Sequence, residues 1–151
     1  MNHNQIIEEG KKVVQLELQS IERLLNRLDN NFAETVTSIF NSKGRVVISG
    51  VGKSGLIARK IVATLNSTGT AAISLHPTDA LHGDLGMVRK EDIIIVISKS
   101  GNTDEIVNLV TFLKRIGVTI IGMLGSTNSA LSKLCDIVLD ISVDEEACPN
   151  D

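Results

Sequence analysis

Apolar residues recur at helical spacing through the first part of the chain. Between residues 5 and 28 they fall every three or four positions, at Val13, Leu16, Ile21, Leu24, Leu25 and Leu28. This period of about 3.6 residues predicts an amphipathic helix. The polar run 29–31 interrupts the pattern, and a shorter helix is predicted over 32–40.

After Gly44 the pattern changes to short β-branched runs that alternate with helical segments. Strands are predicted over 45–49, 71–75, 92–98, 118–123 and 135–141. Helical patterns follow the first strand to about Gly69, the third to about Ile116, and the fourth over 128–134. A polar stretch, 76–84, follows the second strand. Such alternation predicts a parallel sheet with helices on both faces.

Five strands of this kind predict an α/β fold, a three-layer α-β-α sandwich with the flavodoxin-like order 2-1-3-4-5. In this order strands 1 and 3 are neighbours, and the winding reverses between them. Ligands bind at the carboxyl ends of strands beside such a reversal. The turns over 50–55 and 98–103 follow strands 1 and 3, so the sequence predicts one site formed by both turns.

The pattern also divides the chain. We expect residues 1–44 to form helices that pack on a domain spanning residues 45–151. A doubly wound sheet normally covers its last strand with a helix, whereas this sequence stops soon after the predicted fifth strand. We therefore expect the domain to be truncated at its C-terminal end.

Composition mainly excludes alternatives. Hydrophobic residues make up 42% of the 151 residues, with three Phe and neither Trp nor Tyr, so the core is expected to be aliphatic. A net charge of −3 argues against a nucleic-acid partner. We expect no membrane span and a cytoplasmic location, because no apolar run approaches ~18 residues and no signal peptide is visible. Cys135 and Cys148 make neither a disulfide framework nor a metal site, so no metal is expected.

The first turn, Gly50-Val-Gly-Lys-Ser-Gly55, has the spacing G-x-G-x-x-G, which alone is a weak sign of a dinucleotide site. The second strand ends 74–76 without the acid that would bind a ribose, and a P-loop would need its first glycine at Val47. With a dinucleotide site and a P-loop disfavoured, the turn is interpreted as an anion site, in which backbone amides at a helix N-terminus bind the anion and Lys53 is a nearby cation. The alternative is a tight turn with no ligand.

The second turn, Ser98-Lys-Ser-Gly-Asn-Thr103, carries three hydroxyls and one glycine before a helix. Hydroxyls beside helix N-terminal amides suit a phosphate. An N-cap needs only one hydroxyl, so the surplus favours a ligand. A Ser/Thr-rich cap that binds nothing is the alternative.

Together these turns resemble the SIS (sugar isomerase) domain family, and the resemblance runs from about Arg45 onward. Three further stretches are similar to the arabinose 5-phosphate isomerases: 67–70, 76–87 and 146–149. The resemblance implies an aldose–ketose isomerase that interconverts D-ribulose 5-phosphate and D-arabinose 5-phosphate through an enediolate, in lipopolysaccharide 3-deoxy-manno-octulosonate synthesis. It implies no cofactor, a pentose phosphate as ligand, and a homodimer or homotetramer. The family continues with a further phosphate-binding helix start, a histidine and often a CBS module, which we expect to be absent from these residues.

Carried over position by position, the resemblance implies two sets of site residues. The phosphate-binding set is Gly52, Ser54, Ser98, Ser100, Gly101 and Thr103, and the catalytic set is Lys53, His82, Glu105 and Glu146. Isomerisation needs a base to move a proton between adjacent carbons and a cation or donor for the oxyanion. Lys53 is the candidate for the oxyanion, and His82 for ring opening or proton transfer. Glu105 and Glu146 both remain candidates for the base, which would need a raised pKa.

Each catalytic candidate also has an ordinary structural explanation. An acid in the first turn of a helix, as predicted for Glu105, is favoured by the helix dipole. Glu146 fits a solvated acidic loop, and His82 fits a backbone contact in a turn. Two other functions stay open: an isomerase for another sugar phosphate, such as a hexulose 6-phosphate, and a non-catalytic SIS sensor. A sensor needs the phosphate turns but not the acids, so the joint presence of these residues favours an enzyme.

Overall fold

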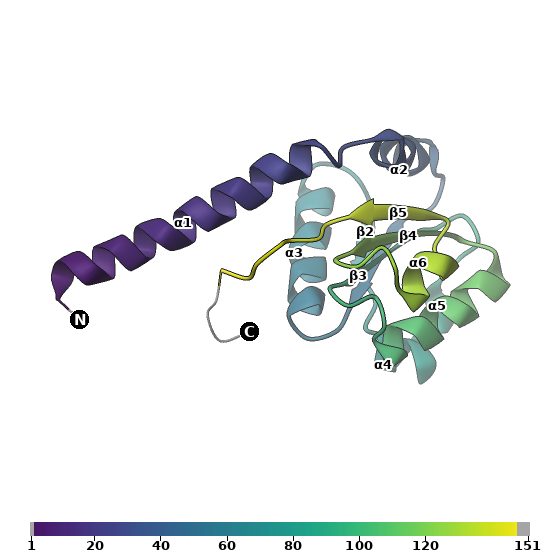
Figure 1. Ribbon diagram of the computed structural model, residues 1–151. Helices are drawn as coiled ribbons and strands as arrows, with labels where there is room; N and C mark the ends of the chain where they lie inside the picture. Colours follow the sequence, from purple (N-terminus) through teal and green to yellow (C-terminus); the bar gives the residue numbers. More distant parts are fainter. Residues whose placement is uncertain (1, 148–151) are drawn as a thin grey trace.

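The chain forms a five-stranded parallel sheet flanked by helices, in a computed structural model that describes residues 2–147 (Figure 1). The strands are β1 (Val46–Gly50), β2 (Ala72–Ser74), β3 (Ile93–Ser98), β4 (Thr119–Leu124) and β5 (Ile137–Asp140). Their order is β2-β1-β3-β4-β5, and every neighbouring pair is parallel. This confirms the predicted order 2-1-3-4-5.

Helices cover both faces of the sheet, as the β-branched strands require. The helices are α1 (His3–Leu25), α2 (Asn30–Asn41), α3 (Lys53–Ser67), α4 (Pro77–Leu81), α5 (Asp104–Ile116) and α6 (Ala130–Leu134), with a 3₁₀ turn, η1 (Asp84–Met87). On one face α4, α5 and α6 pack on Val47, Ile94 and Val96. On the other, α3 and Ile39 of α2 pack on Ile48 and its neighbours. The predicted three-layer α/β sandwich is confirmed.

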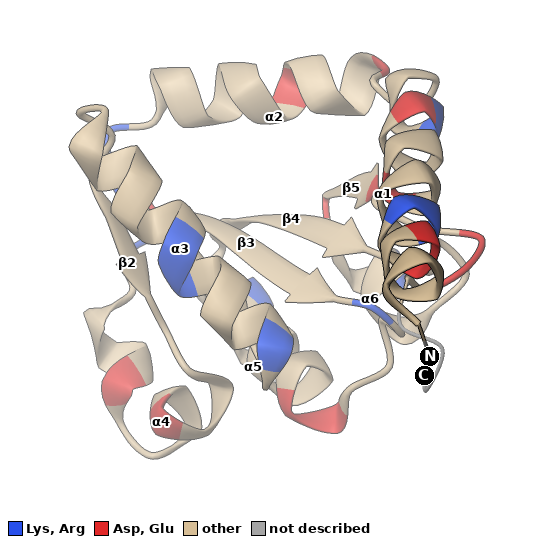
Figure 2. Cartoon of the chain, turned by 90° about the vertical axis from the view of Figure 1, so that its left-hand side faces the viewer, with Lys and Arg blue, Asp and Glu red and all other residues tan. Residues whose placement is uncertain are grey.

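The two N-terminal helices differ in how they meet this body. α2 packs through Ile39 and donates a hydrogen bond from Asn31 Nδ2 to Val138 O, 3.2 Å away. α1 has no buried residue and extends beyond the sheet (Figure 1), and Figure 2 shows it nearly end-on at one edge of the molecule. Its end is held by ion pairs, between Arg23 and Asp144 and, just after the helix, between Arg27 and Asp140. No helix of residues 2–147 has the length and apolar character to cross a membrane.

Several element boundaries differ from the sequence-based expectation. α1 ends at Leu25, three residues early, because Asn26 caps it. The polar stretch 76–84, for which no helix was predicted, contains α4, whose N-cap His76 accepts a hydrogen bond at Nδ1 from the Thr78 amide. Cys135 precedes β5 rather than starting it, and it packs beside the core, where burial raises the pKa of its thiol to about 11.

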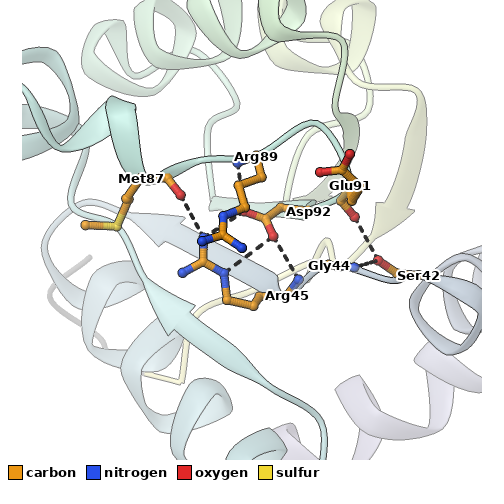
Figure 3. Close-up of polar contacts among 7 residues, drawn as sticks. All are labelled: Ser42, Gly44, Arg45, Met87, Arg89, Glu91 and Asp92. Atoms are coloured by element: carbon orange, nitrogen blue, oxygen red, sulfur yellow. Dashed lines mark hydrogen bonds and ion pairs between the residues drawn. The ribbon is translucent and has the colours of Figure 1, made fainter.

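A buried ion pair joins β1 and β3 at their amino ends (Figure 3). The side chain of Asp92 is fully buried and accepts hydrogen bonds from the Arg45 amide at 2.8 Å, Arg45 Nη2 at 2.9 Å and the Arg89 amide at 3.0 Å. Arg45 Nη2 also donates to Met87 O at 2.7 Å. Burial alone would raise the pKa of Asp92, but the hydrogen bonds and charge of Arg45 outweigh it and lower that pKa. The pair aligns the two central strands whose opposite ends carry the predicted site.

Candidate functional site

The turn after β1 brings the start of α3 close to the strand. Gly50 and Gly55 pack backbone to backbone, so that a Cβ on Gly55 would lie 2.7 Å from Gly50 O. Gly52 caps α3 with a φ of 58°, which favours glycine. These glycines are therefore needed for the tight turn itself, which is the role that the sequence suggested as the alternative to anion binding. The same turn also places Ser54 in the first turn of α3, toward β3.

The turn after β3 is shaped by its own hydroxyls. Ser98 is buried, and its Oγ accepts a hydrogen bond from the Gly101 amide at 3.0 Å. Ser100 Oγ accepts one from the Asn102 amide at 3.2 Å. Gly101 has a φ of 66°, and a Cβ there would lie 2.2 Å from Ser129 Oγ. Ser98 Oγ also lies 3.5 Å from Thr103 Oγ1, and either hydroxyl can donate to the other. The Ser100 hydroxyl keeps a proton that it can donate to an anion.

These two turns line one hollow of about 370 Å³ at the carboxyl ends of β1 and β3. We call it the cradle; its lining residues are Val51, Ser54, Ile97, Ser98, Lys99, Ser100, Thr103, Ile106 and Gly125. The sequence predicted that both turns form one site, and the structure brings four of the six predicted phosphate-binding residues into it. The other two, Gly52 and Gly101, shape the turns through their backbone.

A second hollow of about 320 Å³ adjoins the cradle. It shares four lining residues with the cradle, namely Ser54, Ile97, Lys99 and Gly125. Its other lining residues are Lys53, Ile57, Ile141, Val143 and Glu146. We call it the adjoining hollow. It contains two predicted catalytic residues, Lys53 from α3 and Glu146 from the segment after β5.

Glu146 forms an ion pair with Lys99, which lies in the turn after β3. The hydrogen bond and the charge of Lys99 lower the pKa of Glu146 against the opposing effect of burial, and the charge of Lys53 adds a lesser lowering effect. Glu146 is therefore an ionised carboxylate at neutral pH in the ligand-free chain. A base of lowered pKa has the right protonation state but abstracts a proton weakly.

The two remaining catalytic candidates lie outside both hollows. Glu105 is exposed in the first turn of α5, one residue before Ile106, which lines the cradle. His82 is the exposed C-cap of α4. Neither side chain lines the cradle or the adjoining hollow as residues 2–147 form them. Their catalytic roles stay predictions.

Sequence reasoning missed two residues that line both hollows, Lys99 and Gly125. Lys99 lies at a variable position of the second turn, where the motif gives no signal. Gly125 follows β4, whose carboxyl end lies beside that of β3, so the predicted strand order contained the signal for it. Asn102 is at another variable position, yet its Oδ1 accepts a hydrogen bond from the Ala130 amide at 2.9 Å and so fixes the turn against α6. Across the described residues, no three His, Cys, Asp or Glu side chains cluster as metal ligands would.

This arrangement defines a class of protein: a doubly wound α/β domain with hydroxyl-lined and cationic hollows where its winding reverses. The profile of the SIS domain matches residues 38–150. The chain belongs to the SIS domain family.

Curated proteins similar to this chain include arabinose 5-phosphate isomerases. The chain is 43% identical over 143 residues to "Arabinose 5-phosphate isomerase KdsD" of Pseudomonas aeruginosa, covering 95% of this chain and 44% of that protein. It is 45% identical over 150 residues to a "Probable arabinose 5-phosphate isomerase" of Haemophilus influenzae, covering 99% and 44%. The chain thus spans less than half the length of these relatives.

Solved structures agree with the fold. A protein of E. coli CFT073, described as a complex with arabinose 5-phosphate, superposes with a TM-score of 0.93 at 41% identity, covering 99% of this chain and 80% of that one. A putative sugar-phosphate isomerase from Listeria monocytogenes gives a TM-score of 0.94 at 37% identity, covering 99% and 79%. The Vibrio vulnificus NanR protein complexed with ManNAc-6P shares the fold, with a TM-score of 0.80 at 20% identity, covering 91% and 52%.

Proposed function

We propose that this chain is the sugar-phosphate-binding domain of an aldose–ketose isomerase that interconverts D-ribulose 5-phosphate and D-arabinose 5-phosphate. The observation that carries the proposal is the adjacency of the cradle to a hollow holding Lys53 and Glu146. A ligand anchored by its phosphate in the first hollow places its sugar in the second. The names of the curated relatives, and the similar structure described as a complex with arabinose 5-phosphate, support the pentose phosphate.

The cradle holds the phosphoryl group through hydroxyls and amides. Ser54 comes from α3, and Ser98, Ser100 and Thr103 come from the turn after β3, so two neighbouring strand ends grip one group. Amides preceding α3 and α5 add the favourable end of each helix dipole. A phosphate anchored in this way fixes the distance to the reacting carbons.

At the sugar end, isomerisation moves one proton between carbons 1 and 2. Glu146 abstracts it from one carbon, and the ionised enediolate oxygen is stabilised by the ammonium of Lys53. The same carboxyl group returns this proton to the neighbouring carbon, and a second proton passes from one enediolate oxygen to the other. Atoms and charge then balance with no redox partner. Glu105 is the alternative base, and Glu146 is favoured because it lines the hollow together with Lys53.

The test of this function uses the complete protein with D-ribulose 5-phosphate in deuterated water, followed by NMR. We expect deuterium to enter at carbon 2 and arabinose 5-phosphate to accumulate. Glu146→Gln should abolish this exchange, and Glu105→Gln is the matched comparison for choosing the base. Binding of the sugar phosphate without exchange would favour the non-catalytic sensor. Faster turnover of a hexulose 6-phosphate would show that the substrate is a hexulose phosphate rather than a pentose phosphate.

We further propose that the protein self-associates through α1. Its exposed residues Val14, Leu18, Ile21 and Leu25 follow the alternating four- and three-residue spacing of a coiled-coil seam. Ile7 lies one heptad before Val14, with Lys11 at the seam position between them. Leu16, Ser20 and Ile21 line a hollow with the segment 143–147, so Ile21 is the seam residue at this hollow. Ile7, Val14, Leu18 and Leu25 are exposed and are not among its lining residues. A second copy of α1 supplies the apolar partner that the rest of the described chain does not.

Light scattering tests this assembly. Leu18→Glu together with Leu25→Glu should reduce the mass to that of one chain, whereas Gln19→Glu, which adds a charge off the seam, should leave it unchanged. An unaltered mass in the double variant would exclude α1 as the interface.

The proposed function also includes three further expectations from the sequence. They are a cytoplasmic location, a place in 3-deoxy-manno-octulosonate synthesis, and a division of the chain between residues 44 and 45.

A further inference from the structure

Lys99 has no part in the isomerisation proposed above, although it lies between the two hollows. It follows Ser98 directly, lines both the cradle and the adjoining hollow, and forms an ion pair with Glu146. Its side chain is 72% exposed, so its ammonium has room to turn. One cation thus lies within reach of a phosphoryl group in the cradle and of the proposed base.

The pair also presents a chemical difficulty. A base for a carbon-bound proton works best with a pKa near the working pH, whereas Lys99 lowers the pKa of Glu146. The ion pair also engages one oxygen of the carboxylate with the Lys99 ammonium, so that this oxygen is not available to accept a proton from carbon. An efficient base at this position therefore requires the pair to open when substrate is bound.

We propose that Lys99 is a positioning residue that exchanges partners: it holds Glu146 in the ligand-free chain and turns to the substrate's phosphoryl group in the complex, which frees Glu146 for the sugar. This inference rests on the proposed function. A phosphoryl group carries more negative charge than a carboxylate and offers more acceptor oxygens, so it competes for the ammonium. Binding at one end of the substrate thereby prepares the base at the other end.

The charges around Glu146 fix the direction of the effect. It faces the cations Lys99 and Lys53, and it shares a hollow with the acids Glu17 of α1 and Glu145. When Lys99 leaves, Lys53 is the remaining attracting charge, and the pKa of Glu146 rises toward its ordinary value or above. Lys53 does not line the cradle and stays at the sugar end.

Binding of inorganic phosphate to the complete protein, measured by calorimetry at pH 7.5, tests the exchange without any turnover. Lys99→Met should weaken binding about tenfold, because it removes a charged contact. Glu146→Gln should strengthen binding up to about fivefold, because Lys99 no longer has to leave an exposed ion pair. In the Lys99→Met background the gain from Glu146→Gln should disappear.

Two matched variants separate partner exchange from general electrostatics. Glu145→Gln removes one negative charge from the next residue and should not reproduce the gain. Lys43→Met removes a cation at the amino end of the sheet and should leave phosphate affinity unchanged. A gain from Glu146→Gln that persists without Lys99, or equals that of Glu145→Gln, overturns the proposal. So does a wild-type protein that binds no phosphate.

The pH profile of isomerisation gives a readout that a merely structural lysine would not change. The acid limb of kcat/KM reports the free enzyme, and that of kcat reports the substrate complex. Lys99→Met should move the first limb to higher pH, because it raises the pKa of Glu146 in the free enzyme, and leave the second in place. Lys99→Arg should restore both limbs. Limbs that move together refute the exchange.

The two experiments also separate the inference from the function on which it rests. If the complete protein isomerises no pentose phosphate, the proposed function fails, and the phosphate-binding cycle still decides whether Lys99 exchanges partners. If the protein is an active isomerase and the cycle shows no coupling between Lys99 and Glu146, the inference alone fails.

Discussion

Replacing Asp92 with Asn should strongly destabilise the fold. The carboxylate is fully buried and accepts hydrogen bonds on both oxygens, from Arg45 and from the Arg89 amide (Figure 3). An asparagine has one oxygen and one amide group, so in either orientation at least one N–H donor faces another donor. Breaking a buried pair costs roughly 3–5 kcal/mol. We expect about 3 kcal/mol, the lower end, because the Arg45 side chain is 31% exposed.

The assay is urea denaturation followed by circular dichroism at pH 7, with Glu91→Gln as the matched control. Glu91 is the neighbouring residue, and its side chain is exposed. Its hydrogen bond from Ser42 is accepted by the backbone oxygen, so a change of the side chain leaves this bond in place. The control should change the free energy of unfolding by less than about 0.5 kcal/mol. A loss of less than about 1 kcal/mol for Asp92→Asn, or one equal to that of Glu91→Gln, would refute the reasoning.

The same pair makes a pH-dependent contribution of known sign. Because the pKa of Asp92 is lower in the folded chain, its stabilisation is complete above the ordinary aspartate value near 3.9 and is lost as the pH falls from there through the folded value. The stability difference between the wild type and Asp92→Asn should therefore shrink below about pH 4. A difference that stays constant down to pH 3 would show that the carboxylate charge is not its source.

Three further predictions concern the cradle and the one cysteine that the structure describes. Ser100→Ala should weaken phosphate binding by about 1–2 kcal/mol, a five- to thirty-fold change in the calorimetric dissociation constant, if its hydroxyl donates to the anion. Gly101→Ala should lower the urea midpoint, because its φ of 66° and the Ser129 side chain both oppose a Cβ; Gly10→Ala, in open space on α1, should raise it slightly. Cys135, with a thiol pKa of about 11, should react with a thiol reagent at pH 8 far more slowly in the folded than in the urea-unfolded protein, measured in a Cys148→Ser background.

The strand order and the place of the site could be predicted from sequence because both follow from local patterns. A β-branched run such as 93–98 is typical of a strand that is buried on both faces of a parallel sheet. Five such strands alternating with helices fit a doubly wound order, which contains a reversal of winding. Ser54 and Ser98 come together for the same reason, since adjacent parallel strands end at one edge.

What could not be predicted depends on contacts between segments far apart in sequence. Lys99 carries no local signal, and its importance arises only because the segment after β5 returns Glu146 to the tip of β3. The partner of Asp92 lies 47 residues away, at Arg45. The five-residue helix α4 was missed because one turn and a half is too short to show a period, and its His76 cap is not a usual capping residue.

The two ends of the central strands explain why stability and binding should respond to different residues. At the amino ends, Asp92 and Arg45 satisfy one another and neighbouring backbone groups in a buried pair. At the carboxyl ends, the cradle leaves hydroxyl protons and the Lys99 ammonium accessible to a ligand. A parallel sheet separates these ends by the length of a strand, so substitutions at the amino ends should alter unfolding with unchanged phosphate affinity. Removing the Ser100 hydroxyl should mainly weaken phosphate binding, because in the free chain its oxygen accepts one exposed hydrogen bond, from the Asn102 amide.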